Sequence, residues 1–197
     1  MNNVSKANTM QLPLFPLQIY LLPGGISKLR IFEPRYTRLV KLAMGDGNGF
    51  GLCMKDEETM CHFGTRVIIT DFEQLPDGLL GITIKGVEKF LINKHWQEED
   101  GLRFGDVTPI SNWTPSQIKF VDRDISNSLK ALFDEYPEHA ENYPLPDYND
   151  MTWVCQRWLE LLPLETNQKQ WFMSRNDHRA ALSFLHNVID EQLKSDS

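Results

Sequence analysis

The side chains best suited to hold a metal ion are Cys53, Cys61 and His62. Thiolates and imidazoles are preferred zinc ligands, but a closed zinc site needs four of them at a characteristic spacing. No fourth ligand follows these three nearby, so the spacing predicts no metal site and Cys53 is expected to pack in the core as a small hydrophobe. With Cys155, the 3 cysteines form an odd, sparse set that fits a reducing compartment rather than a disulfide framework.

Glycines at Gly81 and Gly86 have the separation found in a phosphate-binding loop. That loop requires a lysine and then a serine or threonine, which contact the phosphates and magnesium. Here the next residues are Val87 and Glu88, so the motif is incomplete. The pattern is better interpreted as glycines in a strand–turn–strand segment, and no nucleotide cofactor is expected.

The neighbouring pair Asp177-His178 carries side chains that catalytic sites use. Adjacent residues on a helix do not face each other, however. Asn176 or Asp177 is more simply the N-cap of a last helix. No Gly-x-Ser-x-Gly nucleophile motif is present either. The sequence therefore predicts no catalytic, cofactor-binding or metal-binding residue, and we expect no enzymatic activity.

Basic side chains gather in one stretch early in the chain. They are Lys28, Arg30, Arg35, Arg38 and Lys41, with only Glu33 opposing them. Such a row suits an acidic peptide or RNA, and it equally suits pairing with surplus carboxylates. The formal net charge of -7 disfavours a nucleic-acid partner. Pairing within the protein is the favoured interpretation, and RNA binding is kept as the alternative.

Short strand signals fill residues 10–112. Strands are predicted at 11–17, 28–31, 50–54, 65–72, 80–84, 87–92 and 102–110. Prolines cannot donate to a ladder, so Pro13 and Pro16 predict an edge strand or an extended segment at 11–17. One helix is predicted with Pro34 at its first position, an apolar face at Tyr36, Leu39, Val40 and Ala43, and an end near Gly45. This mixture predicts a small, curled, barrel-like sheet.

Helical spacing takes over from residue 113. The segment Thr114-Pro-Ser-Gln117 has the sequence of a capping box and predicts a helix start there. Further helices are predicted over 151–162, around Trp171 and Phe172, and over 181–189. Between them, residues 134–150 hold six acidic residues, three prolines and no lysine or arginine. We interpret this run as a solvated connector rather than a partner site.

These patterns predict an α+β fold in three parts: a disordered tail at 1–9, a β subdomain at 10–112 and a helical subdomain at 113–197. No linker separates the last two, because Trp113 directly precedes Thr114. We therefore expect them to pack as one cooperative domain. No signal peptide is recognised, and no stretch approaches the roughly 20 apolar residues of a membrane helix. A cytoplasmic location is expected.

Three early motifs resemble the N-terminal domain of Lon-type proteases. They are Leu12-Pro-Leu-Phe-Pro-Leu17, Leu22-Pro-Gly24 and Leu29-Arg-Ile-Phe-Glu-Pro-Arg-Tyr36. The similarity continues through Phe63-Gly-Thr65, Asp77-Gly78, Lys85-Gly86, Lys89-Phe90, Leu161-Leu-Pro-Leu164, Lys169-Gln170, Asp177 and Arg179. Lys89 stands where that family has an arginine. The resemblance covers nearly the whole chain.

This resemblance implies a PUA-like β-barrel followed by a helical bundle. It implies the recognition domain alone, without the ATPase and protease modules. The motif residues expected to be structural are Pro13, Phe15, Pro16, Pro23, Phe32, Glu33, Arg35 and Tyr36. Among them, Phe15 and Phe32 are expected to bury apolar area. Glu33 is expected to accept hydrogen bonds at the helix start, and Arg35 to clamp a carboxylate or carbonyl groups.

The resemblance further implies a protein-binding module for unfolded or degron-bearing polypeptides, or an accessory to proteolysis. Its recognition surface is expected to be apolar, either a groove between barrel and helices or a free strand edge. Candidate partner-binding residues are Trp96, Trp113, Arg35 and Arg38. Both tryptophans lie at segment ends beside polar residues, and the alternative is that they pack internally. PUA-like folds also occur in RNA-modifying proteins, which keeps RNA binding through Lys28–Lys41 open.

Overall fold

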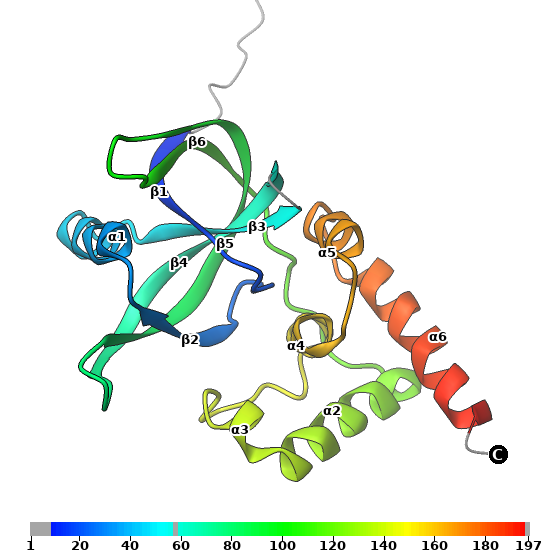
Figure 1. Ribbon diagram of the computed structural model, residues 1–197. Helices are drawn as coiled ribbons and strands as arrows, with labels where there is room; N and C mark the ends of the chain where they lie inside the picture. The colour runs from blue at the N-terminus through cyan, green and yellow to red at the C-terminus, as the bar shows by residue number, and fades with distance from the viewer. Residues whose placement is uncertain (1–8, 57–58, 196–197) are drawn as a thin grey trace, which may run out of the picture. The chain divides into compact units, whose positions relative to one another are not determined.

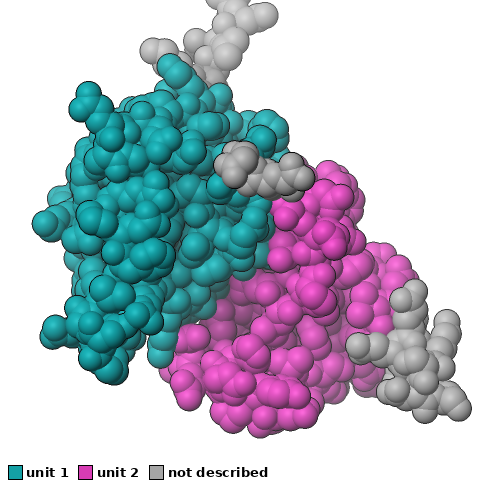
Figure 2. Space-filling view, viewed as in Figure 1, with its two compact units in different colours: residues 1–111 teal, residues 112–197 magenta. Residues whose placement is uncertain are grey.

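The computed structural model describes residues 9–56 and 59–195, and Figure 1 shows the path of the chain. The tail expected at residues 1–9 therefore lies outside the described residues except for Thr9. The chain divides into two compact units, residues 1–111 and residues 112–197, coloured separately in Figure 2. Both units contain buried hydrophobic side chains.

The first unit is a curled sheet of six strands with one helix. Its elements are β1 (Met10–Pro16), β2 (Ile26–Ile31), α1 (Pro34–Gly45), β3 (Phe50–Asp56), β4 (Thr59–Gln74), β5 (Leu80–Gln97) and β6 (Arg103–Ile110). The strand order is β2-β5-β4-β3-β1-β6, and a further pairing of β5 with β6 closes the sheet on itself. Of the strands in the described residues, β2 alone lies outside this closed ring, and it pairs with β5. The expected α+β fold with a barrel-like sheet is confirmed.

The prediction that residues 11–17 form an edge strand is wrong. β1 lies inside the sheet, parallel to β3 and antiparallel to β6. The barrel stagger explains how the prolines fit. Pro13 is in register with β6 alone and Pro16 with β3 alone. Each proline therefore has one unpaired flank, where a missing N–H group costs no ladder hydrogen bond.

The predicted turn at Gly86 is also absent. β5 continues through it as one long strand from Leu80 to Gln97. The glycine is instead a point of close approach: its N–H donates to Gly25 O at 2.8 Å, and its carbonyl accepts from Gly24 N at 2.8 Å. A Cβ at this position would lie 2.4 Å from Leu22 O. Residues 22–25 therefore cross the strand where only a glycine leaves room.

Helix α1 matches its prediction closely. It begins with Pro34, ends at Gly45 and buries Tyr36, Leu39, Val40 and Ala43. This face covers one barrel core, where the Phe15 ring stacks on Tyr36 with centroids 3.9 Å apart. A second apolar cluster contains Leu12, Leu14, Cys53, Met60, Phe90, Ile92 and Val107. Alternate residues of β1 and β5 supply apolar side chains to it, as period-two burial requires.

The second unit is helical. Its elements are η1 (Phe120–Asp122), α2 (Arg123–Glu135), α3 (Pro137–Ala140), α4 (Met151–Leu161), α5 (Thr166–Met173) and α6 (Arg179–Ser195). The helices predicted over 151–162, around Trp171 and over 181–189 are therefore found. The short α3 lies in the acidic 134–150 run, where Pro137 takes a first-turn position that suits its missing donor.

The predicted capping box at Thr114 starts no helix. Helical structure begins only at η1, because residues 114–118 are held in extended form by the segment before α4. Ile118 N–H donates to Asn149 O, and Met151 N–H donates to Ser116 O at 2.7 Å. The Asp150 carboxylate caps α4 at Thr152 N–H and also accepts from Ser116 N–H at 2.7 Å. These long-range partners take the backbone groups that a helix would need.

Candidate functional site

An open apolar groove lies between α5 and α6 of the second unit. Its volume is about 690 Å³, within the usual range of ligand sites. The lining residues are Asn167, Gln168, Trp171, Phe172, Ala180, Ser183, Phe184 and Asn187. All eight belong to these two helices. A single unit therefore supplies the whole groove.

Helix spacing places the α5 residues on the groove. Asn167 and Trp171 are four residues apart, as are Gln168 and Phe172, so each pair shares a helix face. The first turn is fixed by a capping box: the Glu165 side chain accepts from the backbone of Gln168, whose own side chain accepts from Glu165 N–H at 3.0 Å. This reciprocal cap holds Gln168 at the groove.

Helix α6 contributes positions 180, 183, 184 and 187. Offsets of three, four and seven residues mark one continuous helix face. The neighbouring face carries the buried residues Ala181 and Leu185, which belong to the core. The groove face thus lies beside the buried face and leaves Ser183 and Asn187 exposed.

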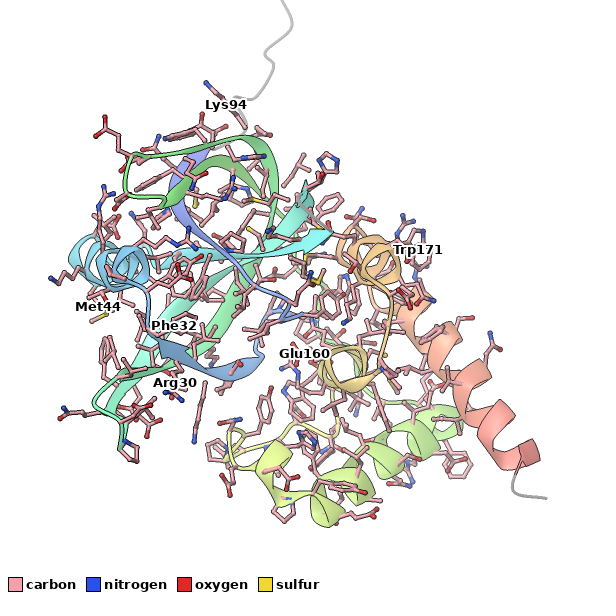
Figure 3. The ribbon with its side chains drawn as sticks, viewed as in Figure 1. Arg30, Phe32, Met44, Lys94, Glu160 and Trp171 are labelled. Carbon is pink, nitrogen blue, oxygen red and sulfur yellow. The ribbon has the colours of Figure 1, made fainter. Side chains whose placement is uncertain are left out.

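Aromatic rings join the two helices. Phe172 is buried and its ring lies 5.4 Å from that of Phe184. Trp171 packs edge-on against Phe172 at 5.0 Å, yet 48% of Trp171 remains exposed. Figure 3 labels Trp171 on α5. The Arg175 side chain packs on Trp171, with its guanidinium carbon 4.4 Å from the centroid of the Trp171 ring. The tryptophan is therefore held in place with much of its surface open to a partner.

The motif residues expected to be structural divide into two groups. Phe15 and Tyr36 pack on each other in the barrel core. Pro23 precedes Gly24, whose φ of 79° gives the turn that approaches β5. Arg35 donates to Gly101 O at 3.3 Å and pairs with Glu33 at 2.7 Å, so it contacts both a carbonyl and a carboxylate. These positions have structural contacts that need no ligand.

Two motif residues depart from their predicted roles. Phe32 is 67% exposed rather than buried, because Leu29 and Ile31 take the inward positions of β2 and the following residue faces outward. The Glu33 side chain makes no capping hydrogen bond at the start of α1. The Glu33 carbonyl already accepts from Tyr36 N–H, and the carboxylate pairs with Arg35.

The candidate tryptophans differ from each other. Trp113 is only 4% exposed, and its indole N–H donates to Arg175 O at 2.8 Å, so the expectation that it is a surface aromatic is wrong and the alternative of internal packing holds. The polar neighbours of this residue suggested exposure, but its N–H found a backbone acceptor inside the helical unit. Trp96 is half-buried and stacks on Phe104 at 6.1 Å.

The candidate arginines connect α1 to the β5–β6 hairpin. Arg38 pairs with Glu98 at 2.6 Å and with Asp100 at 2.8 Å. The guanidinium holds the pKa of the Asp100 carboxyl below its usual value. Arg30 pairs with Asp77 in the same unit. The favoured interpretation, that the basic row pairs with carboxylates, agrees with these contacts.

A strand edge is the other surface expected to bind a polypeptide. Among the described strands, only β2 has a single partner. Its exposed residues are Lys28 and Arg30. Charged side chains at an edge discourage the addition of another strand. The α5–α6 groove is therefore the better candidate.

No group of three or more His, Cys, Asp or Glu side chains able to hold a metal ion occurs within residues 9–56 and 59–195. Cys53, Cys61 and Cys155 are buried. Burial raises the pKa of the Cys53 and Cys155 thiols well above the ordinary range, which suppresses the reactive thiolate. The Asp177 carboxylate accepts from Arg179 N–H at 3.0 Å, a hydrogen bond at the start of the last helix.

Sequence reasoning missed the groove. Trp171 and Phe172 were expected in one helix and residues 181–189 in another, but no groove between these two helices was expected. The α6 groove face alternates Ala180, Ser183 and Asn187 with one phenylalanine, so it lacks the apolar stripe that marks a buried face. The sequence signal for the groove is weak: residues 167 and 171, and residues 183 and 187, are four apart and so share a helix face. This spacing indicates a groove only when α5 and α6 are known to be neighbours.

The sequence places the chain that forms this barrel, helical unit and open groove in a family of substrate-binding domains. The sequence profile of the ATP-dependent protease La (LON) substrate-binding domain matches residues 11–191, and the chain belongs to this family. The resemblance drawn from the opening motifs is thereby confirmed. Within the described residues, no helix has the length and apolar character required to cross a membrane.

Two solved structures are similar over most of the chain. A Lon N-terminal domain protein from Xanthomonas campestris is 28% identical, with a TM-score of 0.74 over 90% of this chain and 98% of that one. The N-terminal domain of the Mycobacterium avium complex Lon protease is 14% identical, with a TM-score of 0.63 over 90% and 97%. The second likeness concerns the fold alone. Comparison with curated protein sequences finds no match.

Proposed function

We propose that this protein is a polypeptide-binding module that takes unfolded or degron-bearing segments into the α5–α6 groove. The observation that carries the proposal is Trp171, a half-exposed indole that lines a groove of about 690 Å³. Unfolded chains differ from folded ones in exposing apolar side chains. When such apolar side chains pack against the aromatic residues of the groove, both surfaces leave water. This burial favours binding by about 25 cal/mol per Å² of apolar surface.

Membership of the Lon substrate-binding family supports the same role. We infer that the module acts as an accessory to proteolysis by holding a segment without cutting it. The absence of phosphate-loop and nucleophile motifs in the sequence motivates the expectation that it hydrolyses neither ATP nor casein. A cytoplasmic location belongs to the same proposal.

Binding of a permanently unfolded protein, reduced and carboxymethylated, tests this function. Trp171→Ala should weaken its binding about tenfold or more, because truncation of a central aromatic typically costs 2 kcal/mol or more. Phe120→Ala is the matched control, since Phe120 is 81% exposed and lies outside the groove. Fluorescence anisotropy of the labelled client measures both. Equal binding by wild type and Trp171→Ala would refute the groove as the site.

RNA binding remains the alternative proposal. Arg30, Arg35 and Arg38 each pair with a carboxylate, so phosphate contacts would have to compete with these pairs. We expect any binding to be weak and sensitive to salt.

A further inference from the structure

Among the described residues that line the α5–α6 groove, none carries a charged side chain. Beside its apolar residues it offers the primary amides of Asn167, Gln168 and Asn187 and the hydroxyl of Ser183. A charged group brought against these side chains loses water, and none of them supplies a counter-ion, which is unfavourable. The groove chemistry therefore selects against charged segments.

The amides also have hydrogen-bonding capacity to offer. The Asn167 carbonyl oxygen accepts from Gln168 N–H and the Gln168 oxygen accepts from Glu165 N–H, so both oxygens serve the start of α5. Within the described part of the chain, no amide nitrogen of Asn167, Gln168 or Asn187 donates to a protein acceptor. Each carries two N–H donors. The groove thus presents donors next to exposed aromatic surface.

A peptide backbone is the partner that such donors fit. An extended segment leaves a carbonyl and an N–H group of each residue available, whereas a helix satisfies its own backbone groups internally. Alternation of side chains along an extended segment directs some toward the aromatic wall and others away from it. We propose that the groove binds uncharged, extended polypeptide segments, with Asn167, Gln168 and Asn187 hydrogen-bonding the segment backbone and Trp171 and Phe184 contacting its apolar side chains. This proposal rests on the proposed function.

Four labelled peptides test the proposal by fluorescence anisotropy. The parent is Gly-Ser-Leu-Thr-Gln-Thr-Phe-Ser-Gly, in which the leucine, glutamine and phenylalanine side chains share one face of the extended segment. Two variants replace the glutamine by glutamate or by lysine. The fourth keeps every side chain but replaces two central amides by esters, which removes N–H donors and weakens carbonyl acceptors. Both charged variants should bind at least tenfold more weakly than the parent. The ester variant should lose about threefold to tenfold in affinity, the usual effect of a hydrogen bond.

Protein variants locate the effect. Asn187→Leu keeps the side-chain size and removes the amide, so parent binding should fall about threefold to tenfold. Asn127→Leu on α2 is the matched control, an exposed asparagine outside the groove, and should bind like wild type. Circular dichroism checks that both variants keep their helices.

The outcomes separate the two proposals. If wild type fails to bind the parent peptide and the unfolded client alike, the proposed function itself is wrong. If the parent binds but the ester peptide and Asn187→Leu show unchanged affinity, the function stands and backbone recognition by the amides is overturned. Equal binding of the glutamate or lysine peptide would overturn the selection for uncharged segments.

Discussion

At the scale of single residues, Lys89 is a buried cation in the β-barrel. It is fully buried on β5, and desolvation lowers its pKa to about 8. In the unfolded chain a lysine titrates near 10.4. Between these values the unfolded state binds more protons than the folded state. The free energy of unfolding therefore rises as the pH rises from about 8 to about 10.5.

The substitution Lys89→Met should remove this pH dependence. We expect wild type to gain about 2–3 kcal/mol relative to the variant across that pH window, from the size of the pKa shift. Urea unfolding at intervals from pH 7 to pH 10.5 measures it. Lys94→Met is the control, because Lys94 is exposed on the same strand, where Figure 3 labels it. Parallel pH profiles for wild type and Lys89→Met would contradict the assignment.

Residue-scale prediction succeeded where local pattern decides burial. The 3–4 spacing in α1 identified Tyr36 and its neighbours as core residues. It failed at Phe32 and Trp113 for different reasons. Phe32 directly follows the inward-facing Ile31 and therefore faces outward, whereas the Trp113 indole donates to Arg175 O, 62 residues later. Hydrophobicity alone does not determine either outcome.

At the scale of elements, Asp150 joins the extended segment before η1 to the start of α4. Its carboxylate accepts from Ser116 N–H at 2.7 Å and from Thr152 N–H at 3.0 Å. Thr152 Oγ1 also donates to Thr114 O at 2.6 Å. One carboxylate thus satisfies two backbone donors that would otherwise lack a partner.

The substitution Asp150→Ala should lower the free energy of unfolding by about 1–3 kcal/mol, through a lost helix cap and an unsatisfied donor. Asp150→Asn should retain most of the stability, since an asparagine oxygen can accept the same hydrogen bonds. Chemical denaturation followed by circular dichroism compares the two. If the alanine variant is as stable as the asparagine variant, Asp150 does not hold this junction.

The same junction explains which elements the sequence could predict. Strands and helices with a clear period were located, but their bounds were less accurate: β4 begins at Thr59 rather than at residue 65, and the strands predicted at 80–84 and 87–92 are one strand, β5. The capping-box pattern at Thr114 was misleading because pairing with residues 149–151 competes for the same backbone groups. Likewise, Pro13 and Pro16 predicted an edge strand. In the barrel register, Pro13 pairs only with β6 and Pro16 only with β3, so each proline has one side without a strand partner.

At the scale of the whole molecule, residues 1–111 and 112–197 form two compact units. The sequence motivates the hypothesis that they unfold together, because no linker separates Ser111 from the segment that begins at Thr114. We expect a single calorimetric transition for the intact chain and a molten or insoluble product from a truncation ending near Ser111. Two separate transitions, one reproduced by the isolated 1–111 fragment, would show that the units are thermodynamically independent.

The central claim is that the α5–α6 groove binds unfolded polypeptide. The most direct measurement is an NMR titration of the isotope-labelled chain with the carboxymethylated client, following backbone amides and the Trp171 indole. We predict that chemical-shift changes concentrate at residues 167–172 and 180–187. The Trp171 indole signal should be among the first to move as the client is added. Changes confined to the outer edge of β2, at Ile26–Ile31, with the groove signals unmoved, would contradict the claim.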